Sequence, residues 1–124
     1  MMDIEEAAQI AARAAGDKKA TDIVILDLRQ IASFTEYFVI ASGASNRQVQ
    51  AISNEVEERL RKSGKRPLHI EGYSSAEWIL LDYGDFIVHV FSNSSRQFYD
   101  LERLWRDAGR IEVKEEGRPE EAQD

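Results

Sequence analysis

The chain has 124 residues, enough to bury one hydrophobic core and too few for two, so we expect a single domain. Apolar residues make up 43% and charged residues 31%, which argues against global disorder, and the absence of cysteine excludes disulfides and thiolate sites. A net charge of -7 argues against a protein that grips nucleic-acid phosphates by itself, and it favours a basic protein partner.

The start of the chain does not resemble a targeting segment. A signal peptide needs a basic start and an apolar stretch, whereas Asp3, Glu5 and Glu6 stand here, and no run of 18 apolar residues occurs. We therefore expect a cytoplasmic protein.

The first forty residues predict one helix and two strands. Asp3 and Glu6 have the spacing of a capping box, and apolar residues, mostly alanine, then recur at helical intervals up to Gly16. Residues 22–29 and 37–42 are dense runs of β-branched, leucine and aromatic residues, which is typical of buried strands.

A second helix is predicted next. Ser45 and Gln48 form another capping box, and apolar residues follow at steps of three and four, which indicates a helix over residues 46–63. Gly64 is a good terminating residue, and residues 68–71 are a candidate for a short third strand.

The clearest hairpin in the chain follows, and then a last helix. Residues 77–83 and 85–91 are two strand-like runs separated by Gly84. A serine or asparagine within residues 93–95 can cap the last helix, which ends near Gly109. One face of this helix is predicted to carry Phe98, Leu101, Leu104 and Trp105. The predicted order is helix, strand, strand, helix, strand, strand, strand, helix.

The end of the chain has a different composition. Residues 114–124 have no periodicity and almost no apolar residue, so we expect an acidic, disordered tail after a domain of residues 1–113.

Strand alternation divides the hairpin into two faces. With the loop centred on Tyr83 and Gly84, Asp82 lies opposite Asp85, and a register slide of two residues leaves each side chain on its face. The core face carries Ile79, Leu81, Phe86, Val88 and Val90. The opposite face mixes aromatic, aliphatic and acidic groups, namely Trp78, Leu80, Asp82, Asp85, Ile87, His89 and Phe91.

Two interpretations of the mixed face stay open at this point. Tryptophan supplies a large rigid contact area, and neighbouring carboxylates can pair with Arg or Lys, so the face suits a protein interface. In the alternative, a helix covers Trp78, Leu80 and Ile87, and only the aspartates at the loop are exposed.

Several linked motifs resemble the ribosome silencing factor (Iojap-like) family. The first signature is Tyr-Phe-Val-Ile-Ala-Ser-Gly over residues 37–43, followed by Ser-Asn-Arg-Gln-Val over residues 45–49. The second is Glu-Gly at residues 71–72 with Glu-Trp-Ile-Leu-Leu-Asp-Tyr-Gly-Asp over residues 77–85, and it continues through residues 89–91 and 96–105. The match runs from about Ile4 to Val113, with one departure at residues 74–76, where the family often has a glycine.

The resemblance implies an α/β fold with a mixed sheet of about five strands flanked by helices, related to nucleotidyltransferases but without their chemistry. It implies binding to the protein numbered fourteen of the large ribosomal subunit, which blocks joining of the small subunit and lowers translation when nutrients are short. Members are commonly homodimers. By position, the family's contact surface maps onto Trp78, Leu80, Asp82, Tyr83, Asp85 and His89.

A magnesium-dependent nucleotidyltransferase is the enzymatic alternative, and a dimeric scaffold without a ribosomal role is another. The Gly-Ala-Ser turn at residues 43–45 could hold an anion, although a capped turn is the commoner meaning. No Asp-x-Asp or Glu-x-Glu pair follows the predicted second helix on a strand, so the metal cage is missing and we expect no enzyme and no cofactor.

Three further groups have a functional and a structural interpretation. Asp82 and Asp85 with His89 could be imagined as catalytic, but a hairpin tip is normally open to solvent. Residues 94–96 could bind phosphate, although a plain helix cap is commoner. The basic cluster of residues 59–66 could touch ribosomal RNA beside the docked protein, or it could be a solvated helix end.

Overall fold

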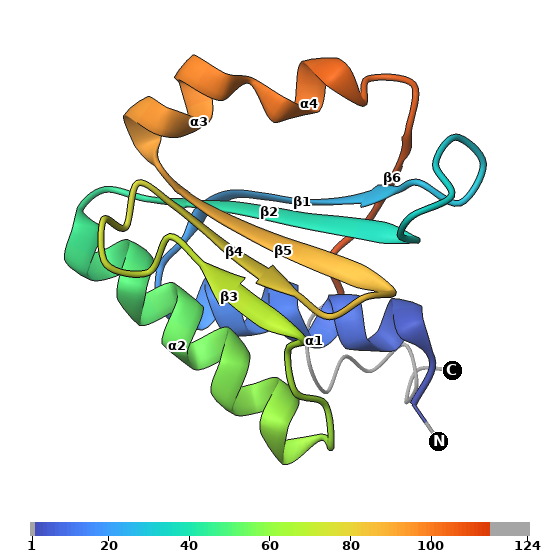
Figure 1. Cartoon of the computed structure of the whole chain (residues 1–124), viewed down its shortest axis with the longest axis horizontal. Coiled ribbons are helices and arrows are strands. Elements are labelled where there is room, and N and C mark those ends of the chain that lie inside the picture. The colour runs from blue at the N-terminus through green and yellow to red at the C-terminus, as the bar shows by residue number, and fades with distance from the viewer. Residues whose placement is uncertain (1, 115–124) are drawn as a thin grey trace.

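A mixed β-sheet forms the middle layer of the computed structural model, which describes residues 2–114 (Figure 1). Its six strands follow the order β3-β4-β5-β2-β1-β6. β2 runs parallel to β5, and the other neighbouring pairs are antiparallel. In chain order the elements are α1 (Ile4–Asp17), β1 (Thr21–Asp27), β2 (Tyr37–Gly43), α2 (Asn46–Lys62), β3 (His69–Glu71), β4 (Trp78–Asp82), β5 (Phe86–Ser92), α3 (Asn93–Tyr99), α4 (Leu101–Leu104) and β6 (Gly109–Ile111).

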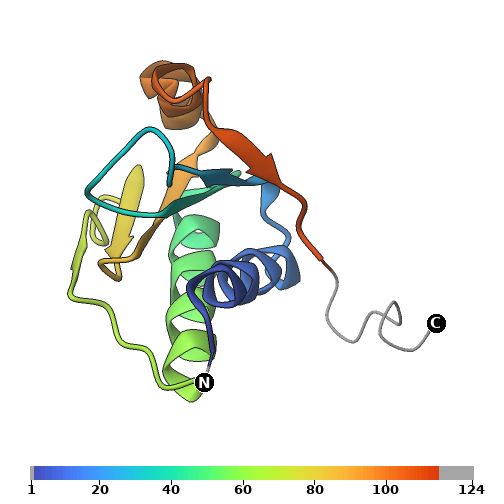
Figure 2. The same cartoon turned by 90° about the vertical axis from the view of Figure 1, so that its right-hand side faces the viewer.

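Helices cover both faces of this sheet, and each face has its own core. α1 and α2 lie on one side, and α3 and α4 lie on the other (Figures 1 and 2). The N-cap half of the capping box predicted for α1 forms, because Asp3 Oδ1 accepts a hydrogen bond of 2.8 Å from the Glu6 amide. Six alanines of α1 are buried, and their small side chains let this helix pack closely on β2 and α2.

The two central strands are the most buried. All seven residues of β2 are buried, which matches the continuous apolar run in the sequence, since both faces of this strand are covered. β5 lies beside β2, and β4 extends the sheet toward the edge strand β3. The β4–β5 hairpin thus joins the buried centre of the sheet to its open edge.

The predicted element order is confirmed up to β5, and the strand count is six instead of about five. The additional strand, β6, has three residues and pairs with β1. The predicted last helix is broken at Asp100, whose backbone is left-handed with φ of 50°, so α3 and α4 form in its place.

This break rotates the predicted apolar face. Leu101 and Trp105 pack on the second core as expected, whereas Phe98 and Leu104 are 80% and 75% exposed. The cap of α3 is Ser92, one residue before the predicted candidates. No helix in the described part of the chain is long and apolar enough to cross a membrane. The predicted tail, apart from Lys114, lies outside the described residues.

Candidate protein-binding surface on the β4–β5 hairpin

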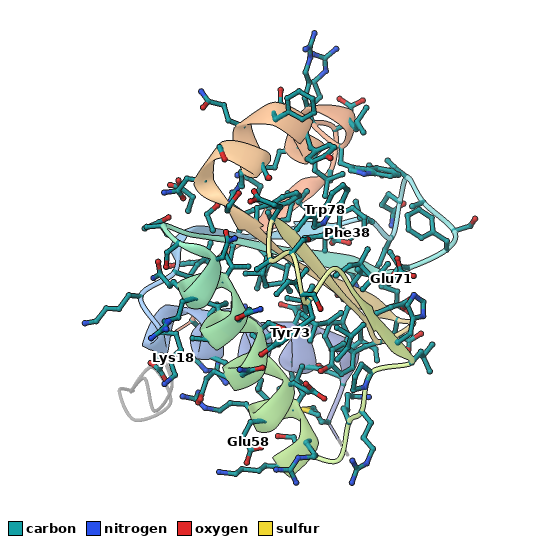
Figure 3. All side chains as sticks on the ribbon, turned by 60° about the vertical axis from the view of Figure 1, so that its left-hand side comes forward. Lys18, Phe38, Glu58, Glu71, Tyr73 and Trp78 are labelled. Carbon is teal, nitrogen blue, oxygen red and sulfur yellow. The ribbon has the colours of Figure 1, made fainter. Side chains whose placement is uncertain are left out.

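The hairpin has the two faces that alternation predicts. The predicted core face, Ile79, Leu81, Phe86, Val88 and Val90, is confirmed, since each of its side chains is at most 1% exposed. These side chains join the core against α1 and α2. The other face points toward α3 and α4, as Figure 3 shows for Trp78.

The hairpin register differs by two residues from the one predicted. Asp82 pairs with Ile87, so the loop consists of Gly84 and Asp85. Gly84 has φ of 84°, which favours glycine, and its amide donates a 2.8 Å hydrogen bond to Asp82 Oδ1. Because the shift is an even number of residues, every side chain keeps its predicted face.

The mixed face lies between the two interpretations that the sequence left open. α3 covers one end, where Phe91 is fully buried. Toward the loop, Leu80, Asp82 and Ile87 are half-buried, and Asp85 is exposed. A partly open surface with apolar and acidic groups therefore remains at the tip of the hairpin.

Trp78 is held between this surface and α3. Its indole Nε1 donates a hydrogen bond of 3.0 Å to Nδ1 of His89. Its ring centroid lies 4.9 Å from that of Phe91 and 4.8 Å from that of Tyr99. The indole is half-buried, so one part is fixed by these contacts and the rest can meet a partner.

His89, which was predicted as a contact residue, is a buried neighbour of Trp78 in the isolated chain. It is 3% exposed, and burial lowers its pKa to about 3, so the imidazole is neutral at pH 7. Since Nδ1 accepts the indole hydrogen bond, the proton is assigned to Nε2, which has no hydrogen-bond partner within the described residues. His89 therefore positions the indole.

Tyr83, another predicted contact residue, is half-buried at the hairpin tip. Alternation puts it on the side of Leu81, and its ring stacks on Phe86 with a centroid distance of 4.8 Å. Its hydroxyl is buried without a partner in the described part of the chain, and desolvation raises its pKa. Tyr83 supports the loop from the side of α1 and α2, opposite the mixed face.

Sequence reasoning missed the loop between β1 and β2, residues 28–36, which packs against the hairpin tip. Thr35 Oγ1 donates a hydrogen bond of 2.9 Å to the Gly84 carbonyl, and the Glu36 amide donates one of the same length to the Asp85 carbonyl. Only the parallel pairing of β2 with β5 brings these segments together, and no local pattern reveals that pairing.

The two candidate anion sites are occupied by the chain itself. The capped turn at residues 43–45 is confirmed, because Ser45 accepts from the Gln48 amide while Gln48 Oε1 accepts from the Ala44 amide. At the start of α3, the hydroxyls of Ser92 and Ser95 donate to the carboxylate of Glu77, and a carboxylate there opposes phosphate binding.

The structure does not assemble a catalytic carboxylate group around His89. Its neighbours are aromatic, and no carboxylate within residues 2–114 lies within ion-pair distance of it. Oδ2 of Asp82 instead lies 3.8 Å from Nε2 of His69 on the edge strand β3. No group of three or more His, Asp or Glu side chains that could hold a metal ion occurs in this described segment.

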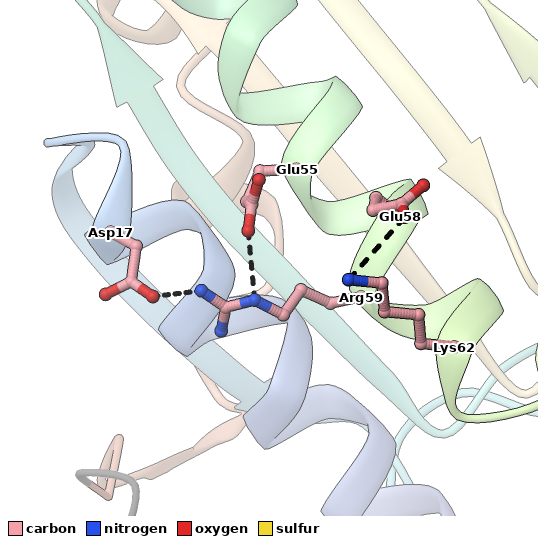
Figure 4. A network of polar contacts seen from close by, with 5 residues as sticks. All are labelled: Asp17, Glu55, Glu58, Arg59 and Lys62. Carbon is pink, nitrogen blue, oxygen red and sulfur yellow. Dashed lines mark hydrogen bonds and ion pairs between the residues drawn. The ribbon is translucent and has the colours of Figure 1, made fainter.

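The basic cluster of residues 59–66 is largely paired within the chain. Arg59 binds Asp17 and Glu55, and Lys62 lies 3.7 Å from Glu58, as Figure 4 shows. Arg61 also binds Glu58. Arg59 therefore joins α1 to α2, and the pairs of Arg61 and Lys62 lie within α2.

Comparisons with known proteins show relatives of this chain in sequence and in fold. The model of the family described as "ribosomal silencing factor during starvation" matches residues 1–124. The ribosomal silencing factor RsfS of Halalkalibacterium halodurans is 40% identical over 112 residues, covering 90% of this chain and 96% of that protein. The RsfS of Bacillus subtilis is 44% identical over 100 residues, covering 81% and 85%. A crystal structure of a Chromobacterium violaceum protein superposes with a TM-score of 0.83 at 36% identity, covering 95% and 98%.

Proposed function

The chain belongs to the family of ribosomal silencing factors, and we propose that it binds the large ribosomal subunit through the mixed face of its β4–β5 hairpin. The partner is the protein numbered fourteen of that subunit, on the side that would otherwise meet the small subunit. A factor seated there blocks subunit joining sterically and represses translation under nutrient limitation. It acts in the cytoplasm, by binding and without catalysis.

One observation carries the assignment of the surface. A half-buried indole, Trp78, lies on the same face as half-buried Leu80 and Ile87, and exposed Asp85 lies at the end of that face. An aromatic anchor surrounded by aliphatic and charged groups is the usual composition of an interface hot spot. The restrained indole loses little freedom when a partner binds.

Charge supports a basic partner. The chain carries -7 overall, and Asp82, Asp85 and Glu71 flank this corner of the sheet. Ribosomal proteins that bind RNA need basic groups, so an acidic factor can steer toward one of them by long-range attraction.

The chemistry of the described residues supports binding in preference to catalysis. A nucleotidyltransferase must hold magnesium between several carboxylates, and no such group occurs within residues 2–114. The anion sites that such an enzyme would use are filled by Gln48 and Glu77.

Two further parts belong to the proposal. Off the ribosome the chain forms a homodimer, as its exposed apolar side chains Phe98 and Leu104 would favour. At the end of α2, Lys65 and Arg66 form no ion pair within the described part of the chain, and they are available to adjacent ribosomal RNA.

The experiment is a retention assay with the whole chain on a support. Purified large subunits, small subunits and the isolated protein numbered fourteen are passed over it separately. We expect retention of the large subunit and of the isolated protein, with small subunits passing through. If large subunits are retained and the isolated protein is not, the assignment of the partner is wrong. If none of the three samples is retained, the dimeric scaffold is favoured.

A further inference from the structure

The β1–β2 loop carries a large exposed aromatic ring beside the hairpin tip. Phe34 is 57% exposed, and its ring centroid lies 6.2 Å from that of Phe38 and 5.9 Å from that of Trp105. Phe38 itself is buried in the core on the side of the sheet that faces α3 and α4. Phe38 and Trp105 thus orient the Phe34 ring from the side of the protein, while more than half of its surface is exposed to solvent.

Hydrogen bonds hold this loop against the tip of the hairpin. The two hydrogen bonds from Thr35 and Glu36 to the carbonyls of Gly84 and Asp85 are both 2.9 Å long. Thr35 is 5% exposed, so its bond is shielded from competing water. The loop and the hairpin tip therefore form one continuous surface.

An open hollow of about 370 Å³ lies at this junction, and the charged side chains in its lining that form no ion pair with the described residues are acidic. Phe34, Glu36, Asp85 and Arg29 contribute to its lining. The guanidinium of Arg29 is held by both carboxylate oxygens of Asp27, at 2.9 and 2.7 Å. Glu36 and Asp85 form no ion pair within residues 2–114, so two carboxylates remain beside the ring.

We propose that the β1–β2 loop extends the docking surface, and that the hollow beside Phe34 receives a lysine or arginine side chain of the basic partner. This inference rests on the proposed function and adds a site to it. An aromatic face next to two carboxylates attracts a cation in two ways. The ring attracts it through its quadrupole, and the carboxylates form ion pairs with it. The continuity with the hairpin face assigns both contacts to one partner.

The test compares five variants of the whole chain for affinity toward purified large subunits, with Trp78→Ala as the reference for loss of the hairpin contact. Phe34→Ala should weaken binding about tenfold, equivalent to about 1.4 kcal/mol. Phe34→Leu should lose most of this affinity as well, because it keeps apolar area without an aromatic face, whereas Phe34→Tyr should stay within about twofold of the original chain. Ile31→Ala is the matched control, since Ile31 is 43% exposed on the same loop and does not line the hollow.

Thermal unfolding of each variant shows whether a loss of binding reflects a loss of fold. Phe34→Leu keeps the test valid if Phe34→Ala unfolds, because it also removes the aromatic face while keeping apolar area. If Phe34→Ala and Phe34→Leu bind as the original chain does while Trp78→Ala is weakened, this inference falls and the proposed function stands. If the original chain does not bind large subunits, both fall. If the Phe34 variants change only the self-association of the chain, the occupant is a second copy and the inference is overturned.

Discussion

Trp78, the proposed contact residue, is positioned by the hydrogen bond from its indole to His89. Both stand on the predicted interface face, and alternation alone gives them equal status. The structure removes that equality, because His89 is buried among the rings of Phe38, Trp78 and Phe91, whereas Tyr99 of α3 meets only one part of the indole. Which residues a short helix covers depends on where the chain breaks at Asp100, and no pattern in the sequence indicates that break.

The buried imidazole of His89 predicts a pH-dependent stability. Burial lowers the pKa of His89 to about 3, whereas an unfolded histidine titrates near about 6.5. Between these values the unfolded state binds more protons, so the free energy of unfolding should fall by up to about 1.4 kcal/mol per pH unit as the pH drops. Above about pH 6.5 the contribution is constant.

Urea unfolding between about pH 7 and about pH 5, where few carboxylates titrate, measures this dependence. His89→Gln can still accept the indole hydrogen bond and does not titrate, so its slope over this interval should be flatter. Equal slopes for the two proteins would show that His89 titrates normally and is not desolvated.

Neighbouring leucines on opposite faces of β4 give a matched pair. Leu81 is fully buried in the core, so Leu81→Ala should lower the free energy of unfolding by about 2 to 5 kcal/mol. Leu80 is half-buried, so Leu80→Ala should cost less stability and should weaken binding of the large subunit. Chemical unfolding and large-subunit affinity of both variants check this. If the Leu80→Ala protein is less stable than the Leu81→Ala protein, the assignment of the two faces of β4 is wrong.

The strands and helices show what a sequence pattern can and cannot determine. Alternation in the hairpin predicts both faces correctly although the register is two residues off, because the side-chain period of a strand is two. The caps of α1 and α2 are local hydrogen-bond motifs, and both form as predicted. The three-residue strand β6 and the contact between the β1–β2 loop and the hairpin tip depend on distant pairing, which local patterns do not encode.

The tip of the hairpin should steer the partner by charge. Asp85 is exposed, and its side chain takes part in no hydrogen bond or ion pair within the described residues, so Asp85→Lys should leave the turn intact. A basic partner would then meet a like charge, and association should slow most at low salt. Asp82 is left unchanged because its carboxylate shapes the turn.

Glu112→Lys is the control, since it makes the same change in net charge after β6, beyond the opposite edge of the sheet. Stopped-flow association with large subunits at two salt concentrations separates local from overall charge. Equal slowing by both variants would mean that the hairpin tip has no particular part in docking.

The whole molecule has two buried apolar cores, and a few large apolar side chains remain exposed outside them. One core lies under α1 and α2, and the second lies under α3 and α4, where the helix break leaves Phe98 and Leu104 outside. We predict concentration-dependent dimerisation in solution, and light scattering with Leu104→Asp should show a weaker dimer. A single monomeric mass over a wide concentration range would contradict the homodimer.

We propose that the mixed face of the hairpin keeps the two ribosomal subunits apart. Light scattering of purified subunits mixed with increasing amounts of the chain measures joining directly, with Trp78→Ala and Tyr73→Ala as matched aromatic deletions. Tyr73 is 40% exposed in the segment between β3 and β4, on the side of α2 in Figure 3. The original chain and Tyr73→Ala should block joining at similar concentrations, and Trp78→Ala should require about thirtyfold more, equivalent to about 2 kcal/mol. A folded Trp78→Ala protein that blocks joining at the original concentration would contradict this role of the mixed face.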